Sequence, residues 1–395
     1  MRNSLRVVAF FLYNSCLAIF LTYGLFFTRI AADFNASPIW TTLVYATFAI
    51  LYGLSSLFMG ALSDRFGPSR AIAFGGALMG AGLLTSSLAP SLATLVLTYG
   101  VIGGAGTGSM WPTTSYAVFD KFGKDEVRNV TGIVSAGTAF GSVFFAPLEA
   151  FLISTVQWRA AFQVLGVIVL AFAVMAAFGA HGTKGRDRQV IREAIGKAKS
   201  KQFGSLYGYY ALGNAFSRSL VMVFVVPLLE FHGASIILGS VALSAIGAGS
   251  IVGRFAAGFK RLSEEEICGL SFVIQGISIF FLLYARDWVS VVVWSLIFGI
   301  GYGGYIPEFA LLVRKYWGMA EYGSIFGLLL TSYAIGAFTG PILEGYTLQA
   351  TGAFTIGFYL AGIISTLAGI HQILTYKLHR SIYLRMCKFT GILSK

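Results

Sequence analysis

The chain consists of apolar runs of about 20 residues that follow one another with short polar breaks between them. An α-helix of roughly that length crosses the hydrocarbon core of a bilayer, and a lipid-exposed backbone has to form helices or closed barrels. We read twelve such runs, at roughly 7–29, 39–61, 71–89, 92–118, 131–155, 159–180, 205–229, 235–259, 267–285, 288–313, 323–347 and 353–376. They predict an all-α integral membrane protein with twelve transmembrane helices.

The composition excludes a water-soluble globular protein. Only 11% of the residues are charged, against about 25% in soluble domains, and 56% are hydrophobic. The 48 glycines suit closely packed membrane helices. A net charge of +12 would suggest a nucleic-acid partner in a soluble chain. Here the Lys and Arg mark loops at a membrane surface, so we expect no nucleic-acid partner.

The basic residues predict the orientation of the chain. With the N-terminus inside, 23 of the 28 Lys and Arg fall in inner segments, and only Arg29, Arg159 and Arg286 fall outside. Inner loops are enriched in Lys and Arg, so both termini are expected in the cytoplasm, with the spans in the plasma membrane. The remaining two, Arg218 and Arg254, lie within spans.

The longest polar segment divides the spans six and six. We expect a six-helix bundle over 1–180, a cytoplasmic basic linker over 181–204, a second six-helix bundle over 205–376 and a cytoplasmic basic tail over 377–395. The linker has apolar residues at helical spacing, which fits a helix lying on the anionic inner leaflet. A solvated basic linker fits it equally well.

The two groups of spans repeat each other at a nearly constant offset. At an offset of 195, Gly104, Gly106, Gly108 and Pro112 recur as Gly299, Gly301, Gly303 and Pro307, and Gly132 and Gly141 recur as Gly327 and Gly336. Internal repeats of this kind are typical of transporters that rock two bundles about a central site. The glycine faces are expected to allow close helix packing.

The loop between the second and third spans has the pattern G-x-L-x-D-R-x-G, formed by Gly60, Asp64, Arg65 and Gly67 and followed by Arg70. It resembles the signature loop of the major facilitator superfamily. That resemblance implies a gating loop in which Asp64 latches against the eleventh span near 321–323 and Gly60 permits close helix contact. The equivalent segment after Gly258 lacks the Asp, so only one bundle is expected to carry this gate.

A narrower resemblance rests on three short segments. Tyr23-Gly-Leu-Phe-Phe to Asp33-Phe34, Gly213-Asn214 and Gly253-Arg254 are similar to segments of monocarboxylate transporters and oxalate–formate antiporters. The family carries an Arg in the eighth span that binds the substrate carboxylate, which implies this role for Arg254. The resemblance is incomplete: Ser250, Phe27 and Tyr333 stand where relatives have an Asp and two Lys. The loss of a Lys favours a monoanion over oxalate.

Charged residues inside spans are costly, by roughly 2.5–3.5 kcal/mol for a central Arg, and a guanidinium facing a cavity can bind a carboxylate through two hydrogen bonds. Arg254 is therefore the leading substrate residue, although it could instead reach the inner surface. Arg218 is either a second anion site or the partner of Glu308, which is the candidate for proton coupling. We interpret Glu149, Glu230 and Glu344 as structural. Tyr23, Trp111, Tyr305 and Tyr333 are expected to shape the pocket.

The sequence contains no P-loop, HExxH or GxSxG pattern, and its three Cys are far apart. We therefore expect no enzymatic activity, no cofactor and no metal site. The prediction is a monomeric secondary transporter of small organic anions, namely monocarboxylates such as lactate or pyruvate, by proton symport or anion exchange. An efflux carrier for lipophilic or sugar-like compounds and a non-transporting membrane sensor are the alternatives.

Overall fold

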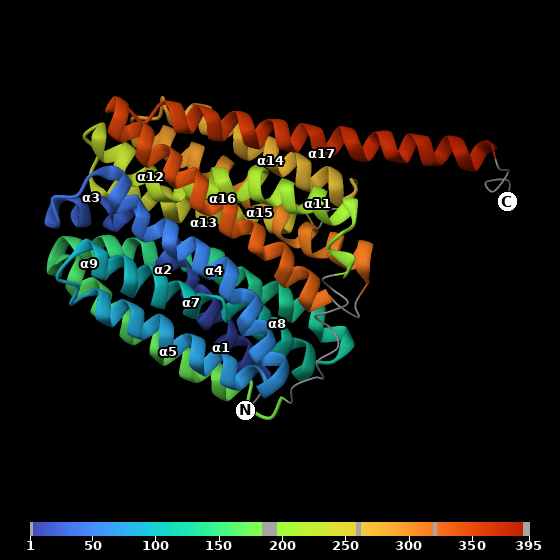
Figure 1. The fold of residues 1–395 in the computed structure, drawn as a ribbon, viewed down its shortest axis with the longest axis horizontal. Coiled ribbons are helices and arrows are strands. Elements are labelled where there is room, and N and C mark those ends of the chain that lie inside the picture. Colours follow the sequence, from blue (N-terminus) through green and yellow to red (C-terminus); the bar gives the residue numbers. More distant parts are fainter. Residues whose placement is uncertain (1–2, 184–195, 258–261, 319–321, 390–395) are drawn as a thin grey trace.

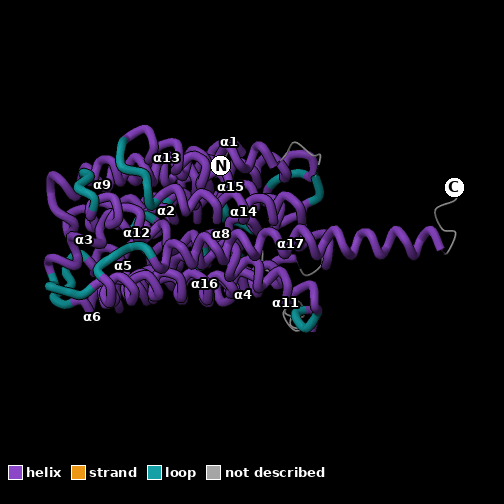
Figure 2. The backbone as a smooth tube through the Cα atoms, turned by 90° about the horizontal axis from the view of Figure 1, so that it is seen from above, coloured by secondary structure: helices purple, strands orange, loops and turns teal. Residues whose placement is uncertain are grey.

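The computed structural model describes residues 3–183, 196–257, 262–318 and 322–389. Within these ranges the chain forms helices joined by turns and loops, without a strand (Figure 2). Ten helical segments there are long and apolar enough to cross a membrane. The predicted all-α membrane fold is confirmed.

Helices occupy all twelve predicted positions. They are α1 (Asn3–Ser15), α2 (Leu17–Leu21), α3 (Gly24–Asp33), α4 (Pro38–Phe66), α5 (Pro68–Ser86), α6 (Leu92–Leu95), the π-helical turn η1 (Val96–Gly103), α7 (Gly104–Thr107), α8 (Met110–Lys121), α9 (Lys124–Gly179), α11 (Lys201–Gly208), the π-helical turn η2 (Tyr209–Phe216), α12 (Ser217–Phe231), α13 (Ile236–Ala257), α14 (Glu264–Leu282), α15 (Trp288–Trp317), α16 (Tyr322–Thr351) and α17 (Ile356–Phe389).

Three elements depart from a simple run of straight helices. The first predicted span is broken twice, into α1, α2 and α3, and α9 covers two predicted spans. The chain leaves the helical conformation inside α9 at Gln157, where φ is 68°, between the fifth and sixth predicted spans. Helix α17 runs on to Phe389, past the predicted boundary at 376, and projects beyond the rest of the molecule (Figure 1).

The helices alternate between two ends of the molecule. The chain starts at one end, near Asn3, and returns to it at Gly67, Phe122, Ser263 and Gly318; we call this the terminal end. The opposite end, reached at Phe34, His232 and Gly352, is called the far end. The described part of the linker ends at Ser200, whose hydroxyl caps α11 by accepting from Phe203 N. Residues 184–195 of the predicted linker lie outside the described residues.

Each half of the chain packs mainly on itself. In the first half (3–183), α1 and α5 pack on α9, and in the second half (196–389), α14 packs on α15 and α17, while α13 packs on α15. The halves occupy different sides of the molecule in Figure 1, blue to green and yellow to red. They meet where α4 contacts α16, α9 contacts α13 and α3 contacts α12.

Glycines allow neighbouring helices to pack closely. A Cβ added at Gly108 would lie 2.1 Å from Ser55 Oγ, and one added at Gly303 would lie 2.0 Å from the Ser250 carbonyl oxygen. Real Cβ atoms do not approach other atoms so closely, so the chain needs glycine directly after α7 and within α15. The close packing predicted for the repeated glycines is confirmed at these two positions, but not at Gly132 and Gly327, where an added Cβ would meet nothing within 4 Å.

Candidate functional site

A cavity of about 50 Å³ lies between the two halves. The first half contributes side chains from α2, α4, α8 and α9, and the second half from η2, α12, α13, α15 and α16. The lining residues are Leu17, Leu21, Tyr52, Trp111, Thr138, Tyr210, Arg218, Arg254, Tyr302, Tyr305, Ile306, Phe309, Phe326, Leu330 and Tyr333. A cavity needs about 10–15 Å³ to hold one water molecule, so this cavity has room for only a few non-hydrogen atoms.

Arg218 stands at the start of α12, directly after the π-helical turn η2. Only 6% of it is exposed. Its Nη1 donates to Tyr302 Oη at 3.1 Å, and its guanidinium lies 5.1 Å and 4.8 Å from the ring centroids of Tyr302 and Tyr333. Cation–π contacts of this kind favour a desolvated guanidinium. Its Nε has no hydrogen-bond partner, so the group keeps a free donor.

Arg254 lies near the terminal end of α13 and lines the same cavity. Its Nη1 donates to the carbonyl oxygen of Ser135 on α9, so it bridges the two halves. Its Nε also lacks a partner. Among the described residues, neither Arg254 nor Arg218 forms an ion pair with a carboxylate. The cavity is therefore strongly electropositive.

The structure brings three of the four predicted aromatic residues to this cavity. Tyr305 and Tyr333 line it from α15 and α16, and Trp111 lines it from α8, with its ring 6.2 Å from that of Phe326 across the interface. Tyr23 is elsewhere: it is fully buried and its hydroxyl donates to the Thr41 carbonyl oxygen at 2.8 Å. The placement of Tyr23 in the pocket is wrong for this structure, because its helix face packs on α4.

Three tyrosines of the cavity, Tyr52, Tyr210 and Tyr302, were missed from the sequence. Tyr302 binds Arg218 directly, and Tyr210 packs on Tyr305 with 5.8 Å between ring centroids. Tyr302 precedes Tyr305 by three residues, so both lie on one face of α15. That spacing was the signal that could have identified Tyr302. No comparable signal marks Tyr210, since its place depends on the π-helical turn.

Glu308, the predicted proton-coupling residue, is 2% exposed on α15 and does not line the cavity. Arg218 forms its side-chain hydrogen bond with Tyr302 and no ion pair with Glu308. The alternative in which Arg218 and Glu308 are partners is therefore not realised here. The role of Glu308 in coupling remains a prediction.

The halves are joined at the far end, beyond the cavity. Arg29 on α3 forms an ion pair with Glu230 on α12, and Thr28 Oγ1 donates to the same carboxylate at 2.7 Å. The rings of Phe27 and Phe224 lie 5.1 Å apart just inside this pair. A Cβ added at Gly24 would lie 2.7 Å from two backbone carbonyl oxygens of α12. These contacts close the far end between α3 and α12.

The predicted gating loop lies at the terminal end. Gly67 has a φ of 86°, and a Cβ there would lie 2.6 Å from the Thr183 carbonyl oxygen, so the turn from α4 to α5 requires glycine. Arg65 lies over the ring of Phe66, and Arg70 is exposed. The close contact expected at Gly60 is absent, since a Cβ would meet Pro112 at an ordinary 3.8 Å. The Asp64 side chain and 319–321 lie outside the described residues, as does the predicted latch.

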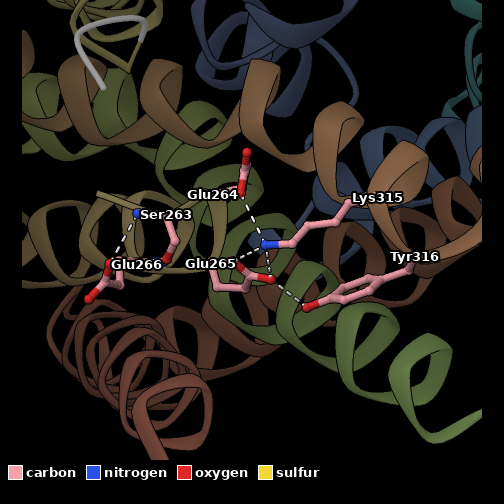
Figure 3. Close-up of polar contacts among 6 residues, drawn as sticks. All are labelled: Ser263, Glu264, Glu265, Glu266, Lys315 and Tyr316. Atoms are coloured by element: carbon pink, nitrogen blue, oxygen red, sulfur yellow. Dashed lines mark hydrogen bonds and ion pairs between the residues drawn. The ribbon is translucent and has the colours of Figure 1, made fainter. Parts of the chain in front are cut away.

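The second half has a polar cluster of its own at the terminal end (Figure 3). Lys315 Nζ on α15 lies 3.1 Å from Glu264 Oε2 and 2.8 Å from Glu265 Oε1, at the start of α14. Tyr316 Oη donates to Glu265 Oε1 at 2.6 Å. The cluster joins α14 to α15 within one half. It was missed because residues 50 apart in sequence form it.

Comparisons with known proteins agree with this architecture. The family profile described as Major Facilitator Superfamily matches residues 8–261 and 209–381, which together cover nearly all of the chain. Monocarboxylate transporter 12-B of Danio rerio is 25% identical over 387 residues, covering 88% of this chain and 80% of the relative. Monocarboxylate transporter 13 of Rattus norvegicus is 23% identical over 379 residues, which cover 93% of this chain and 87% of the relative. Monocarboxylate transporter 3 of Rattus norvegicus is 26% identical over 373 residues, which cover 89% of this chain and 75% of the relative.

The fold, the repeat and the cavity between two halves are those expected of a carrier that moves a small molecule across a membrane. The chain belongs to the major facilitator superfamily, as a multi-pass membrane transporter that resembles the monocarboxylate transporters.

Proposed function

We propose that this protein carries small monocarboxylates, such as lactate or pyruvate, through the cavity between its halves. The observation that carries the proposal is the pair of buried guanidinium groups, Arg218 and Arg254, which share one cavity and pair with no carboxylate among the described residues. Uncompensated buried charge is costly, and an anionic substrate offsets that cost. Each guanidinium also has an unpartnered Nε, a donor available to a carboxylate.

The size and lining of the cavity support a short acid. A volume of about 50 Å³ equals that of roughly four waters, which suits an acid of a few carbons. Five tyrosines line the cavity, so hydroxyls and rings would surround the rest of the substrate. The relatives named monocarboxylate transporters support the same substrate class.

Transport would follow alternating access, with the bundles 1–180 and 205–376 rocking about the site. The far-end contacts of α3 with α12 and the terminal-end bond of Arg254 to Ser135 would open in turn. By the charge bias of the loops, both termini would face the cytoplasm and the far end the outside of the plasma membrane. A monomer contains the complete site. Either proton symport or anion exchange would drive the flux.

The test is counterflow of labelled lactate into proteoliposomes. Hydrogen bonds to a charged group contribute about 1.5–3 kcal/mol each, so the loss of two from one guanidinium predicts at least about 100-fold weaker substrate binding. We expect this for Arg218→Ala, and a comparable loss for Arg254→Ala. Arg286→Ala is the matched control. It removes the same charge at the far end, where Arg286 bonds His232 Nδ1; partial burial, and after it the charge of Arg286, lower the pKa of that histidine.

Near-normal uptake by both cavity variants would refute the assignment. Preference for oxalate over lactate would instead contradict the choice of a monoanion. Saturable export of lipophilic compounds, insensitive to carboxylates, would identify a carrier of another class.

A further inference from the structure

Two acidic residues are buried in equivalent places in the two halves. Glu149 on α9 and Glu344 on α16 are separated by 195 residues, the offset of the repeated glycines. Both are 0% exposed, and neither lines the central cavity. Repeat symmetry therefore gives each half one buried carboxyl group outside the cavity lining, and the surroundings of the two groups can be compared directly.

Glu344 has polar contacts. Thr347 Oγ1 lies 3.4 Å from Glu344 Oε2. The same oxygen faces Gly357 in the first turn of α17, where an added Cβ would lie only 1.8 Å from it. The first N–H groups of a helix have no partner within the helix and attract negative groups. Oε2 of Glu344 is therefore held at the start of α17, while its Oε1 has no hydrogen-bond partner.

Glu149 has no such contacts. Neither Oε1 nor Oε2 has a hydrogen-bond partner. The position equivalent to Gly357 is Phe162, whose ring packs on Phe26 with centroids 4.6 Å apart, so no glycine opens the helix start to this carboxyl group. In the part of the chain that the structure describes, no Lys or Arg pairs with it.

Two polar side chains, Thr22 and Tyr99, lie next to Glu149. The Thr22 hydroxyl lies beside the carboxyl group but donates its own hydrogen to the Ala18 carbonyl oxygen at 2.7 Å. In this conformation neither carboxyl oxygen of Glu149 has a hydrogen-bond partner of its own. Tyr99 is the titratable side chain that interacts with Glu149, and its hydroxyl donates to the Phe20 carbonyl oxygen.

Glu149 also lies at the break in the first span. Thr22 separates α2 from α3, and discontinuous membrane helices commonly form coupling-ion sites in transporters. From Tyr99, ring contacts lead through Tyr23 and Tyr45, and Tyr45 Oη lies 3.3 Å from Tyr333 Oη at the cavity. Movement of α2 and α3 during rocking would change the surroundings of Glu149 and of the cavity together.

We propose that Glu149 binds the proton that accompanies the substrate, and that its symmetry mate Glu344 is structural. This inference rests on the proposed function and selects proton symport over anion exchange. The step forms one O–H bond on Glu149 when the site faces the side of higher proton concentration and breaks it on the other side. One proton and one carboxylate then cross together, with no net charge moved.

The experiment compares two modes of lactate transport in proteoliposomes that contain the full-length protein. Exchange is measured with lactate on both sides at equal pH, and accumulation is measured with a gradient of one pH unit. One-to-one symport predicts about tenfold accumulation by the wild type. We expect Glu149→Gln to keep exchange within about threefold of wild type and to lose accumulation. Glu344→Gln, the matched control, should change both modes in the same proportion.

Three results would overturn the inference. The first is accumulation by Glu149→Gln at the wild-type level, and the second is an equal loss of exchange and accumulation in this variant when it is folded. The third is a wild type that exchanges lactate but does not accumulate it in response to the pH gradient. Each of these results leaves the proposed function standing. A wild type with no lactate flux in either mode would refute the proposed function and this inference with it. If Glu149→Gln does not fold, Glu149→Asp should accumulate lactate with a shifted pH dependence, and an unchanged pH profile would refute the proton site.

Discussion

The ion pair between Arg29 and Glu230 provides a direct test of the closed far end. It joins α3 to α12, and Thr28 is shared between the two charges: Arg29 Nη1 donates to its hydroxyl oxygen at 2.7 Å, and the hydroxyl donates to Glu230 at 2.7 Å. Glu230→Gln keeps the shape of the side chain and removes its charge. We expect this variant to open the far end more often.

The magnitude follows from the exposure of the pair. The Arg29 side chain is 33% exposed and that of Glu230 is 15% exposed. A fully exposed pair contributes about 0.2–1 kcal/mol, and charge-assisted hydrogen bonds away from water contribute about 1.5–3 kcal/mol. For this half-buried pair we expect about 1–2 kcal/mol, which changes the ratio of open to closed molecules by a factor of about 5–30.

The assay is labelling of Leu21→Cys, which lines the cavity, in a background without Cys16, Cys268 and Cys387. A membrane-impermeant maleimide added at the far end reaches Cys at this position only when that end opens. The labelling rate should rise about 5- to 30-fold in Glu230→Gln. The charge-reversed double variant, Arg29→Glu with Glu230→Arg, should return it close to the wild-type rate.

An unchanged rate in Glu230→Gln would refute the reasoning, because the far end would then be held closed by the apolar contacts alone. So would a charge-reversed variant that labels as fast as the singles, since the effect would then come from local damage rather than from the lost pair.

Two further predictions concern stability in detergent, measured by thermal unfolding. Gly303→Ala should destabilise the protein by about 1–3 kcal/mol, because its Cβ would lie 2.0 Å from the Ser250 carbonyl oxygen, whereas Gly327→Ala, with nothing within 4 Å, should not; equal effects would contradict the packing argument. Lys315→Met should cost about 1 kcal/mol by leaving the buried Glu265 without its cation. The double variant Lys315→Met with Glu265→Met should recover that loss, and no recovery would mean that Lys315 acts through other contacts.

The candidate site shows where prediction from sequence stops. Arg218 and Arg254 were identified because an Arg within an apolar span is unusual whatever the tertiary structure, so it can be recognised from the sequence alone. Tyr302 was missed and Tyr23 was expected in the pocket, because both lie in suitable spans and only the rotation of each helix decides which one faces the cavity. Tyr302 faces Arg218, and Tyr23 faces α4.

The sequence by itself determined the membrane class, the positions of the helices along the chain, their repeat at 195 residues and the two arginines inside the spans. These follow from hydropathy and from the cost of charge in lipid, which are local properties of the chain. Only the tertiary structure distinguished Glu149 from Glu344. Both are acids at equivalent positions, but Glu344 has an oxygen that faces a glycine at a helix start, whereas neither oxygen of Glu149 has a hydrogen-bond partner. That difference arises from atoms on other helices, and no pattern along one helix contains it.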